Sequence, residues 1–164
     1  FQDPYTSLDP KQRVGDILTE ALKIHKIGTR ESRMDTALEI MEKVGLRLEH
    51  FYRYPHEFSG GQRQRIGIAR ALAVDPEFIV CDEPVSALDV SIQAQILNLL
   101  RELQKELNIS YIFISHDIGV VNYMSDTILV MNNGTIVESG EAKNVLLNPK
   151  EKYTKKLIES AFLE

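Results

Sequence analysis

The sequence predicts an α/β protein in which a helical lobe precedes a parallel sheet. Apolar residues recur at helical spacing through residues 11–46, which indicates paired amphipathic helices. An apolar run at residues 78–81, a helix-spaced stretch at 90–107 and a second apolar run at 111–114 then follow one another. Strand, amphipathic helix and strand make a βαβ unit, whose handedness rule places the two strands parallel in one sheet.

The helical lobe is expected to hold two helices with Gly28-Thr29 between them. The apolar stripe of the first helix comprises Val14, Ile17, Leu18, Ala21 and Leu22, and that of the second comprises Met34, Ala37, Leu38 and Met41. Residues 48–58 are expected to be irregular. The turn Ser59-Gly60-Gly61 then opens a third helix, which we expect to reach Asp75-Pro76.

In the sheet region, the wholly apolar run from Phe78 to Cys81 predicts a strand that is covered on both faces. Asp89 is expected to cap the helix from Val90 to about Leu107, because a capping side chain accepts hydrogen bonds from the first free N–H groups of a helix. Tyr111 to Ile114 form the second predicted strand.

The remaining chain predicts a hairpin around Asn132-Asn133-Gly134, followed by two short helices around residues 145–147 and 155–162. We expect three segments: a helical segment that includes the third helix, a core segment and a helical tail. These cover residues 1–75, 76–140 and 141–164.

Composition excludes several classes of function. The 164 residues are 43% hydrophobic and 26% charged, which is enough for one core or one core with a helical lobe. A net charge of -5, with basic residues scattered among acids, argues against nucleic-acid binding. The single cysteine, Cys81, excludes an internal disulfide and fits a buried, inert thiol in a reducing compartment. No stretch approaches the roughly 20 apolar residues of a membrane span.

Three polar residues follow the two predicted parallel strands: Asp82, Glu83 and His116. Parallel sheets bind ligands outside the carboxyl ends of their strands, so these residues are expected to converge on one edge. Neighbouring side chains on an extended segment point to opposite sides, so one carboxylate can hold magnesium while the other orients water. The alternative is a strand-end turn with two solvated acids.

The stretch Ser59-Gly60-Gly61-Gln62 predicts an anion site. Two glycines let the backbone approach a ligand, and the following helix presents free N–H groups and the positive end of its dipole. The alternative is a glycine-containing loop in which Ser59 is an ordinary helix cap.

In one fixed order, these segments resemble the second half of an ATP-binding-cassette (ABC) ATPase. Residues 59–72 resemble the signature helix of that family, 78–83 its Walker B strand, 86–89 its D-loop, and His116 its switch histidine. No Gly-x-x-x-x-Gly-Lys-[Ser/Thr] phosphate loop occurs, and the chain opens on Phe1, so we expect that loop upstream in a longer protein. The resemblance implies a partial P-loop NTPase fold, α/β, with a helical subdomain and a parallel-sheet core missing its N-terminal strands.

The resemblance implies ATP and Mg²⁺ as cofactors and gives the strand-end residues their roles. Asp82 would belong to the magnesium shell, and Glu83 would act as the general base. His116 would bond the γ-phosphate and report its loss. Gln2 matches the Q-loop glutamine, which in the family touches the magnesium and the water and is therefore both a catalytic and a metal-binding candidate.

Two segments are implied to act on the nucleotide of a second cassette. In the family, the signature lies against the γ-phosphate held by the other cassette of a dimer, and here it comprises Ser59, Gly60, Gly61 and Gln62. Asp89 belongs to the D-loop, which crosses to the partner cassette. The chain is therefore expected to donate a half-site in trans without a phosphate loop of its own.

Further stretches are similar to the oligopeptide and dipeptide importer branch, namely residues 3–10, 54–58, 85–91 and 148–154. This similarity implies an ATP-hydrolysing subunit that energises peptide uptake, cytoplasmic and peripheral on the inner face of the cell membrane. The implied partners are a second ABC ATPase subunit, identical or a sister, and transmembrane permease subunits. The tail departs from the branch pattern at Glu151-Lys152, where His-Pro is usual.

Two other functions stay open. Without the phosphate cradle, this chain alone is expected to be inactive as an ATPase and to serve as a module that dimerises or docks. The other alternative is a soluble ABC ATPase acting on nucleic acid or ribosomes, which the lack of zinc-type Cys pairing, of a coiled-coil insertion between Gln2 and Ser59 and of a basic face disfavours. Exposed apolar sheet edges also predict self-association or strand exchange.

Overall fold

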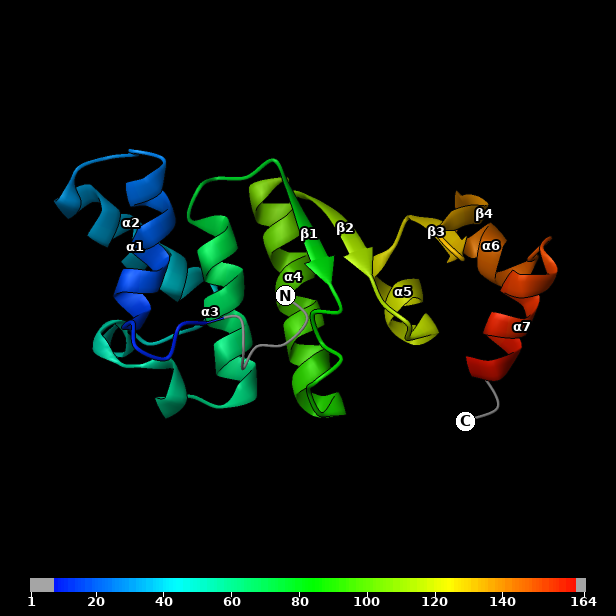
Figure 1. The fold of residues 1–164 in the computed structure, drawn as a ribbon, viewed down its shortest axis with the longest axis horizontal. Coiled ribbons are helices and arrows are strands. Elements are labelled where there is room, and N and C mark those ends of the chain that lie inside the picture. The colour runs from blue at the N-terminus through cyan, green and yellow to red at the C-terminus, as the bar shows by residue number, and fades with distance from the viewer. Residues whose placement is uncertain (1–7, 162–164) are drawn as a thin grey trace. The chain divides into compact units, whose positions relative to one another are not determined.

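The computed structural model describes residues 8–161 of the chain. The Q-loop candidate Gln2 lies outside these described residues. The chain divides into two compact units, Phe1–Ile112 and Phe113–Glu164 (Figure 1).

The first unit begins with the predicted helical lobe. Two α-helices, α1 (Val14–Ile24) and α2 (Arg30–Lys43), confirm the predicted pair. The stretch that follows is not wholly irregular, because it forms two short 3-10 helices, η1 (Leu48–Tyr52) and η2 (Pro55–Glu57). The signature helix is α3 (Gly60–Leu72), and it packs on both α1 and α2.

The βαβ unit is confirmed as β1 (Phe78–Asp82), α4 (Val90–Leu107) and β2 (Ser110–Ile114). The two strands form one sheet. The amide of Ser110 donates to the carbonyl of Glu77 at 3.0 Å, so the beginnings of the strands lie together and the strands run in the same direction (Figure 1). As predicted, Asp89 caps α4, since its Oδ1 accepts from the amide of Ile92 at 3.0 Å.

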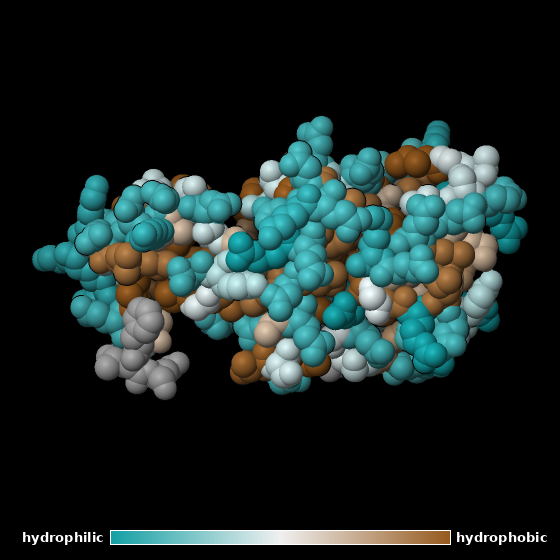
Figure 2. Space-filling view, turned by 180° about the vertical axis from the view of Figure 1, so that it is seen from behind, coloured by the Kyte–Doolittle hydropathy of each residue, from teal (hydrophilic) through white to brown (hydrophobic). Residues whose placement is uncertain are grey.

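The prediction that β1 is covered on both faces is wrong. Ile79 and Cys81 are buried, whereas Phe78 and Val80 are 59% and 45% exposed. Alternate side chains of a strand point to opposite faces, so packing on one face alone leaves every second side chain in solvent. Apolar residues appear among hydrophilic ones on the face shown in Figure 2.

The core of the first unit joins the helical lobe to α4. Large buried side chains of this core come from four helices and include Leu18, Met41, Ile66, Ile96 and Leu100, each at most 1% exposed. Burying side chains of this size contributes about 1.5–3 kcal/mol each, which fixes α3 and α4 relative to the lobe.

The second unit contains α5 (Ile118–Met124), β3 (Thr127–Asn132), β4 (Thr135–Glu141), α6 (Ala142–Leu147) and α7 (Lys152–Ala161). The hairpin prediction is confirmed: β3 and β4 pair antiparallel. Asn133 and Gly134 at the turn have φ of 47° and 78°, as a two-residue hairpin turn requires. A small core packs one face of the hairpin against α6: Ile128, Val130, Ala142 and Val145.

The helix α5 was not predicted from the sequence. It has seven residues, too few for a clear apolar stripe. Its start is fixed by Asp117, whose Oδ1 accepts from the amides of Gly119 and Val120 at 2.8 and 3.1 Å.

The three predicted segments, with boundaries after residues 75 and 140, stay a prediction. Within residues 8–161, no helix combines the length and apolar character needed to cross a membrane.

Candidate functional site: the signature turn and the strand end

The turn before α3 is held by a reciprocal pair of hydrogen bonds. The amide of Gln62 donates to Ser59 Oγ at 3.4 Å, and the amide of Ser59 donates to Gln62 Oε1 at 3.0 Å. Such a capping box satisfies one free helix amide and fixes the direction in which the chain enters the helix. Ser59 is therefore a helix cap, as the alternative interpretation predicts. The cap and an anion site are compatible, because Gly60 and Gly61 keep their own amides at the helix start.

Gly61 is also a packing residue. A Cβ built on Gly61 would lie 2.5 Å from Ile92 Cγ2, far inside normal contact. Only a glycine therefore lets the start of α3 approach the start of α4. Because Asp89 caps α4 through the amide of the same Ile92, this contact holds two of the implied partner-facing segments, the signature turn and the D-loop, at a fixed separation.

The turn that leads to α4 is ordered by local hydrogen bonds. The hydroxyl and the amide of Ser86 both contact the carbonyl of Glu83, at 3.1 and 3.4 Å. The amide of Leu88 donates to the carbonyl of Val85 at 3.1 Å. The D-loop candidate thus starts directly from the strand-end acids and ends at the cap of α4.

Asp82 and Glu83 are both half-buried at the carboxyl end of β1. Glu83 has a φ of 45°, in the left-handed region that side chains other than glycine rarely adopt. The expectation that the two carboxylates alternate along an extended segment is therefore wrong, since the extended backbone ends at Asp82. A residue held in a strained conformation at a strand end is typical of functional sites.

Magnesium is implied here by the family resemblance, and the donor set fits it only in part. Within residues 8–161, no group of three or more His, Cys, Asp or Glu side chains could hold a metal ion. Mg²⁺ bound with nucleotide, however, uses one or two carboxylates together with phosphate oxygens and water. A single strand-end carboxylate, Asp82, meets that requirement, whereas a cage built by protein alone is absent from the described residues.

His116 lies in the second unit, in the bend after β2, and its side chain is exposed. The bend is ordered, because the amide of Asp117 donates to Ser115 Oγ at 3.1 Å and Asp117 then caps α5. The placement after the strand follows the prediction. The convergence of His116 with the strand-end acids stays a prediction, and so does the role of Gln2.

Burial of Cys81 confirms the inert-thiol interpretation. Desolvation raises the pKa of the Cys81 thiol to about 11 and that of the neighbouring Tyr111 hydroxyl to about 12. Tyr111 donates its hydroxyl to the carbonyl of Leu100 at 3.0 Å, so it ties β2 to α4. Both groups therefore stay protonated at neutral pH.

Solved structures define the class of protein. A dimeric ATP-binding cassette in a post-hydrolysis state, bound to ADP and Pi, matches 87% of this chain and 61% of its own, with a TM-score of 0.72 and 30% identity. A putative metal-chelate type ABC transporter in an inward-facing conformation matches 98% of this chain and 64% of its own, with a TM-score of 0.81 and 26% identity. The fold is therefore a partial ABC ATPase fold.

The ABC transporter family itself matches residues 1–86, just over half of the 164 residues. The chain belongs to the ABC transporter family. The oligopeptide transport ATP-binding protein OppF of Bacillus subtilis (strain 168) is 60% identical over 96% of this chain and 52% of its own length. The dipeptide transport ATP-binding protein DppF of Escherichia coli (strain K12) is 53% identical over 96% of this chain and 47% of its own. The chain thus spans about half the length of these relatives.

Two contacts around the signature helix were not predicted from the sequence. One is the close approach of Gly61 to Ile92. The other is the guanidinium of Arg65, which donates to the carbonyl of Val44 at 2.5 Å and passes 3.0 Å from the position of a Cβ on Gly45. Gly45 itself, at φ 72°, follows the C-cap Val44 of α2 in the left-handed position that favours glycine, which the sequence Val44-Gly45-Leu46 signals. Nothing in the sequence indicates that Arg65 donates to the carbonyl of Val44 at that helix end.

Proposed function

We propose that the chain is part of the ATP-binding and ATP-hydrolysing subunit of an ABC importer that takes up peptides. The observation that supports this most is the joint construction of the signature turn and the D-loop. Ser59 and Gln62 fix the first, Asp89 fixes the second, and the contact of Gly61 with Ile92 holds them together. A rigid pair of this kind suits a half-site offered to the nucleotide of a second cassette.

In this proposal, Glu83 accepts a proton from the attacking water, and His116 donates a hydrogen bond to the terminal phosphate. Asp82 and Gln2 would hold Mg²⁺, which supplies neutralisation of phosphate charge when bound. The amides at Gly60 and Gly61 contribute hydrogen bonds to a phosphate held by the partner cassette. Phosphoryl transfer depends on positioning and charge stabilisation, so each of these residues must be held at a defined place around the phosphate.

Peptides are the proposed cargo class because the named relatives are ATP-binding proteins for oligopeptide and dipeptide transport. The proposed partners are a second cassette, identical or a sister subunit, and transmembrane permease subunits. The proposed location is the inner face of the cell membrane.

The test is the ATPase rate of a chain extended upstream to the length of these relatives. Glu83→Gln should remove most turnover and leave ATP binding intact, because the amide cannot accept the proton. The matched control is Glu77→Gln, an exposed residue directly before the same strand, which should keep the parent rate. A normal rate in Glu83→Gln would show that Glu83 is not the base.

The 164-residue chain alone also favours a second function, that of a docking module. Phe78 and Val80 on β1 and Ile112 on β2 are 45–59% exposed, a large apolar share for two adjacent strands. We expect this chain to self-associate through them. Light scattering checks the expectation, and a monodisperse monomer would contradict it.

A further inference from the structure

The tip of the hairpin in the second unit carries an asparagine directly before a glycine. Pairing of β3 with β4 ends at Asn132 and Thr135, so Asn133 and Gly134 are the two loop residues. The hydroxyl of Thr135 donates to the carbonyl of Asn132 at 3.1 Å and closes the turn. Both loop residues are exposed, and apart from chain neighbours nothing lies within 4 Å of the position that a Cβ on Gly134 would take. Solvent therefore reaches the bond between Asn133 and Gly134.

Two groups at this tip are able to react with each other, because no other partner holds them. Within residues 8–161, neither the amide of Gly134 nor the side chain of Asn133 takes part in a hydrogen bond. The side chain of Asn144 is held, by contrast, since its Nδ2 donates to Glu141 Oε2 at 3.0 Å. A glycine also has no side chain that would hinder approach to its own nitrogen. The Gly134 nitrogen is thus open to the side-chain amide carbon of Asn133.

The other asparagines lack this combination. Asn108 is also exposed and has a φ of 53°, close to the 47° of Asn133. The residue after Asn108 is Ile109, which is β-branched and 4% exposed, so its amide nitrogen is shielded. Asn148 precedes Pro149, which has no N–H. Three asparagines lie inside helices, where the backbone amides bond within the helix: Asn98, Asn122 and Asn144.

We propose that Asn133 is a site of spontaneous modification, at which the chain converts its own asparagine into isoaspartate and loosens the hairpin. The nitrogen of Gly134 attacks the side-chain amide carbon of Asn133 and closes a succinimide ring. The side-chain amino group leaves as ammonia and carries away the proton of the Gly134 amide. Water then opens the ring at either carbonyl and gives aspartate or isoaspartate. The step needs no enzyme, because both reacting groups are held next to each other in one chain.

Isoaspartate changes the hairpin through its main chain. The side-chain carbon of residue 133 becomes part of the backbone, which is then one atom longer at the turn. A two-residue turn depends on left-handed backbone at both residues, which Asn133 and Gly134 adopt at φ 47° and 78°. A longer backbone does not fit this turn, so the pairing of Asn132 with Thr135 should loosen. The modification involves no nucleotide, and it therefore stands or falls separately from the function proposed above.

The first arm of the test incubates the 164-residue chain at neutral pH and follows each asparagine by peptide mass spectrometry. Asn133 should become an acid at least about tenfold faster than Asn108, which shares its exposure and its backbone conformation. The rate should rise with pH, because the attacking nitrogen must lose its proton. Asn133→Gln should remove the conversion, since the longer side chain closes its ring slowly. Equal rates at Asn133 and Asn108 would overturn the proposal.

The second arm asks whether the folded turn protects the site. The rate at Asn133 in buffer should lie within about tenfold of the rate in a urea concentration that unfolds the chain, because no hydrogen bond holds the Gly134 amide. Circular dichroism shows which samples are folded. If folding slows the conversion by more than about tenfold, the hairpin shields Asn133 and the proposal is wrong.

The third arm separates the lengthened backbone from the added charge. Chromatography isolates the isoaspartate form, and hydrogen exchange measures local opening of β3 and β4. The strand amides should exchange at least about fivefold faster in this form than in the parent chain. The matched control is freshly prepared Asn133→Asp, which adds the same charge without the extra backbone atom and should exchange like the parent. If the isoaspartate form exchanges no faster than this control, the hairpin is not loosened and the proposed consequence is wrong.

Discussion

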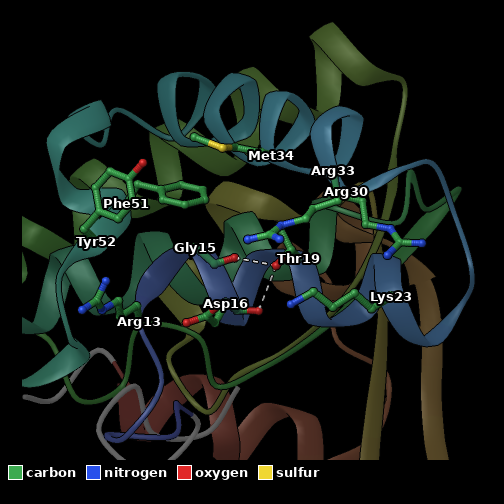
Figure 3. A pocket seen from close by; sticks show the side chains of 10 residues that line it. All are labelled: Arg13, Gly15, Asp16, Thr19, Lys23, Arg30, Arg33, Met34, Phe51 and Tyr52. Atoms are coloured by element: carbon green, nitrogen blue, oxygen red, sulfur yellow. Dashed lines mark hydrogen bonds between the residues drawn. The ribbon is translucent and has the colours of Figure 1, made fainter.

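The signature turn and a pocket of about 570 Å³ between α1, α2 and η1 belong to the same compact unit but are built in different ways (Figure 3). The turn is made of backbone held by short local bonds, Ser59 with Gln62, and by a glycine contact, Gly61 with Ile92. The pocket is made of side chains from three elements that pack against one another. Fixed amides suit a ligand that does not vary, such as a phosphate, whereas the shape of a wall of side chains depends on how the helices of the lobe pack.

Besides the packing of α3 on α1 and α2, two side-chain contacts join these regions. Arg65 on α3 donates to the carbonyl that ends α2, the helix that forms one wall of the pocket. His50 on η1 lies against Phe58, one residue before the signature turn, with ring centres 5.1 Å apart and rings nearly perpendicular. Substitutions at the turn, at Arg65 and at His50 should therefore show how much of the stability of the first unit comes from the turn itself and how much from the contacts that join it to the pocket region.

The largest effect is expected at the signature turn. Gly61→Ala places a methyl group 2.5 Å from Ile92 Cγ2 and should destabilise the first unit by about 1–3 kcal/mol, the usual cost of overpacking. Urea unfolding measures this. Ile92→Ala removes the opposing methyl, so the double variant should be less destabilised than the sum of the single variants. Strict additivity would mean that the two residues do not touch.

An intermediate effect is expected where the two regions meet at Arg65. Arg65→Ala leaves the carbonyl of the fully buried Val44 without its cationic donor and should cost about 1–2 kcal/mol, because Arg65 is only half-buried. Arg65→Lys should restore part of this. The control Arg47→Ala removes an exposed arginine that pairs with Glu49 and should change thermal stability little. Equal losses in Arg65→Ala and Arg47→Ala would contradict the assigned role.

The smallest effect is expected at His50, as a dependence on pH. Burial lowers the pKa of His50, with a further contribution from Arg53, so the folded chain holds the neutral ring. Below about pH 6.5 the unfolded chain takes up a proton that the folded chain does not, and stability therefore falls as the pH falls toward the lowered folded pKa. His50→Phe should reduce this slope in denaturant titrations from pH 7 to pH 5. An unchanged slope would place the titrating group elsewhere.

The comparison also explains how far the sequence could predict the molecule. The helices α1, α3 and α4, the βαβ unit, the hairpin and the cap Asp89 all depend on local spacing and turn residues, which a sequence displays directly. The exposed face of β1 could not be predicted, because an apolar run such as Phe78–Cys81 has the same residue types whether one face of the strand or both faces are packed.

The candidate site likewise contains some features that the sequence predicts and others that it does not. Ser59 to Gln62 and Asp82 were identified by type and spacing, since their surroundings are set by a few neighbouring residues. The left-handed backbone of Glu83 is not signalled by its residue type, and the contact of Gly61 with Ile92 and the pocket between α1 and α2 depend on elements far apart in sequence. Such arrangements appear only when helices pack, and their residue types alone carry no signal.

The most direct test of the central claim is the oligomeric state of the extended chain in the Glu83→Gln form, with and without magnesium ATP, by light scattering. ATP should convert this chain into a dimer, because the turn from Ser59 to Gln62 of one copy completes the nucleotide site of the other. Adding Gly61→Val together with Ile92→Ala, which removes the side chain that a Cβ on Gly61 would meet, should leave ATP binding in calorimetry intact and abolish the dimer. If this double variant stays folded in a circular dichroism melt and dimerises like its parent, or stays folded but no longer binds ATP by itself, the assignment of this turn to a site completed in trans is contradicted.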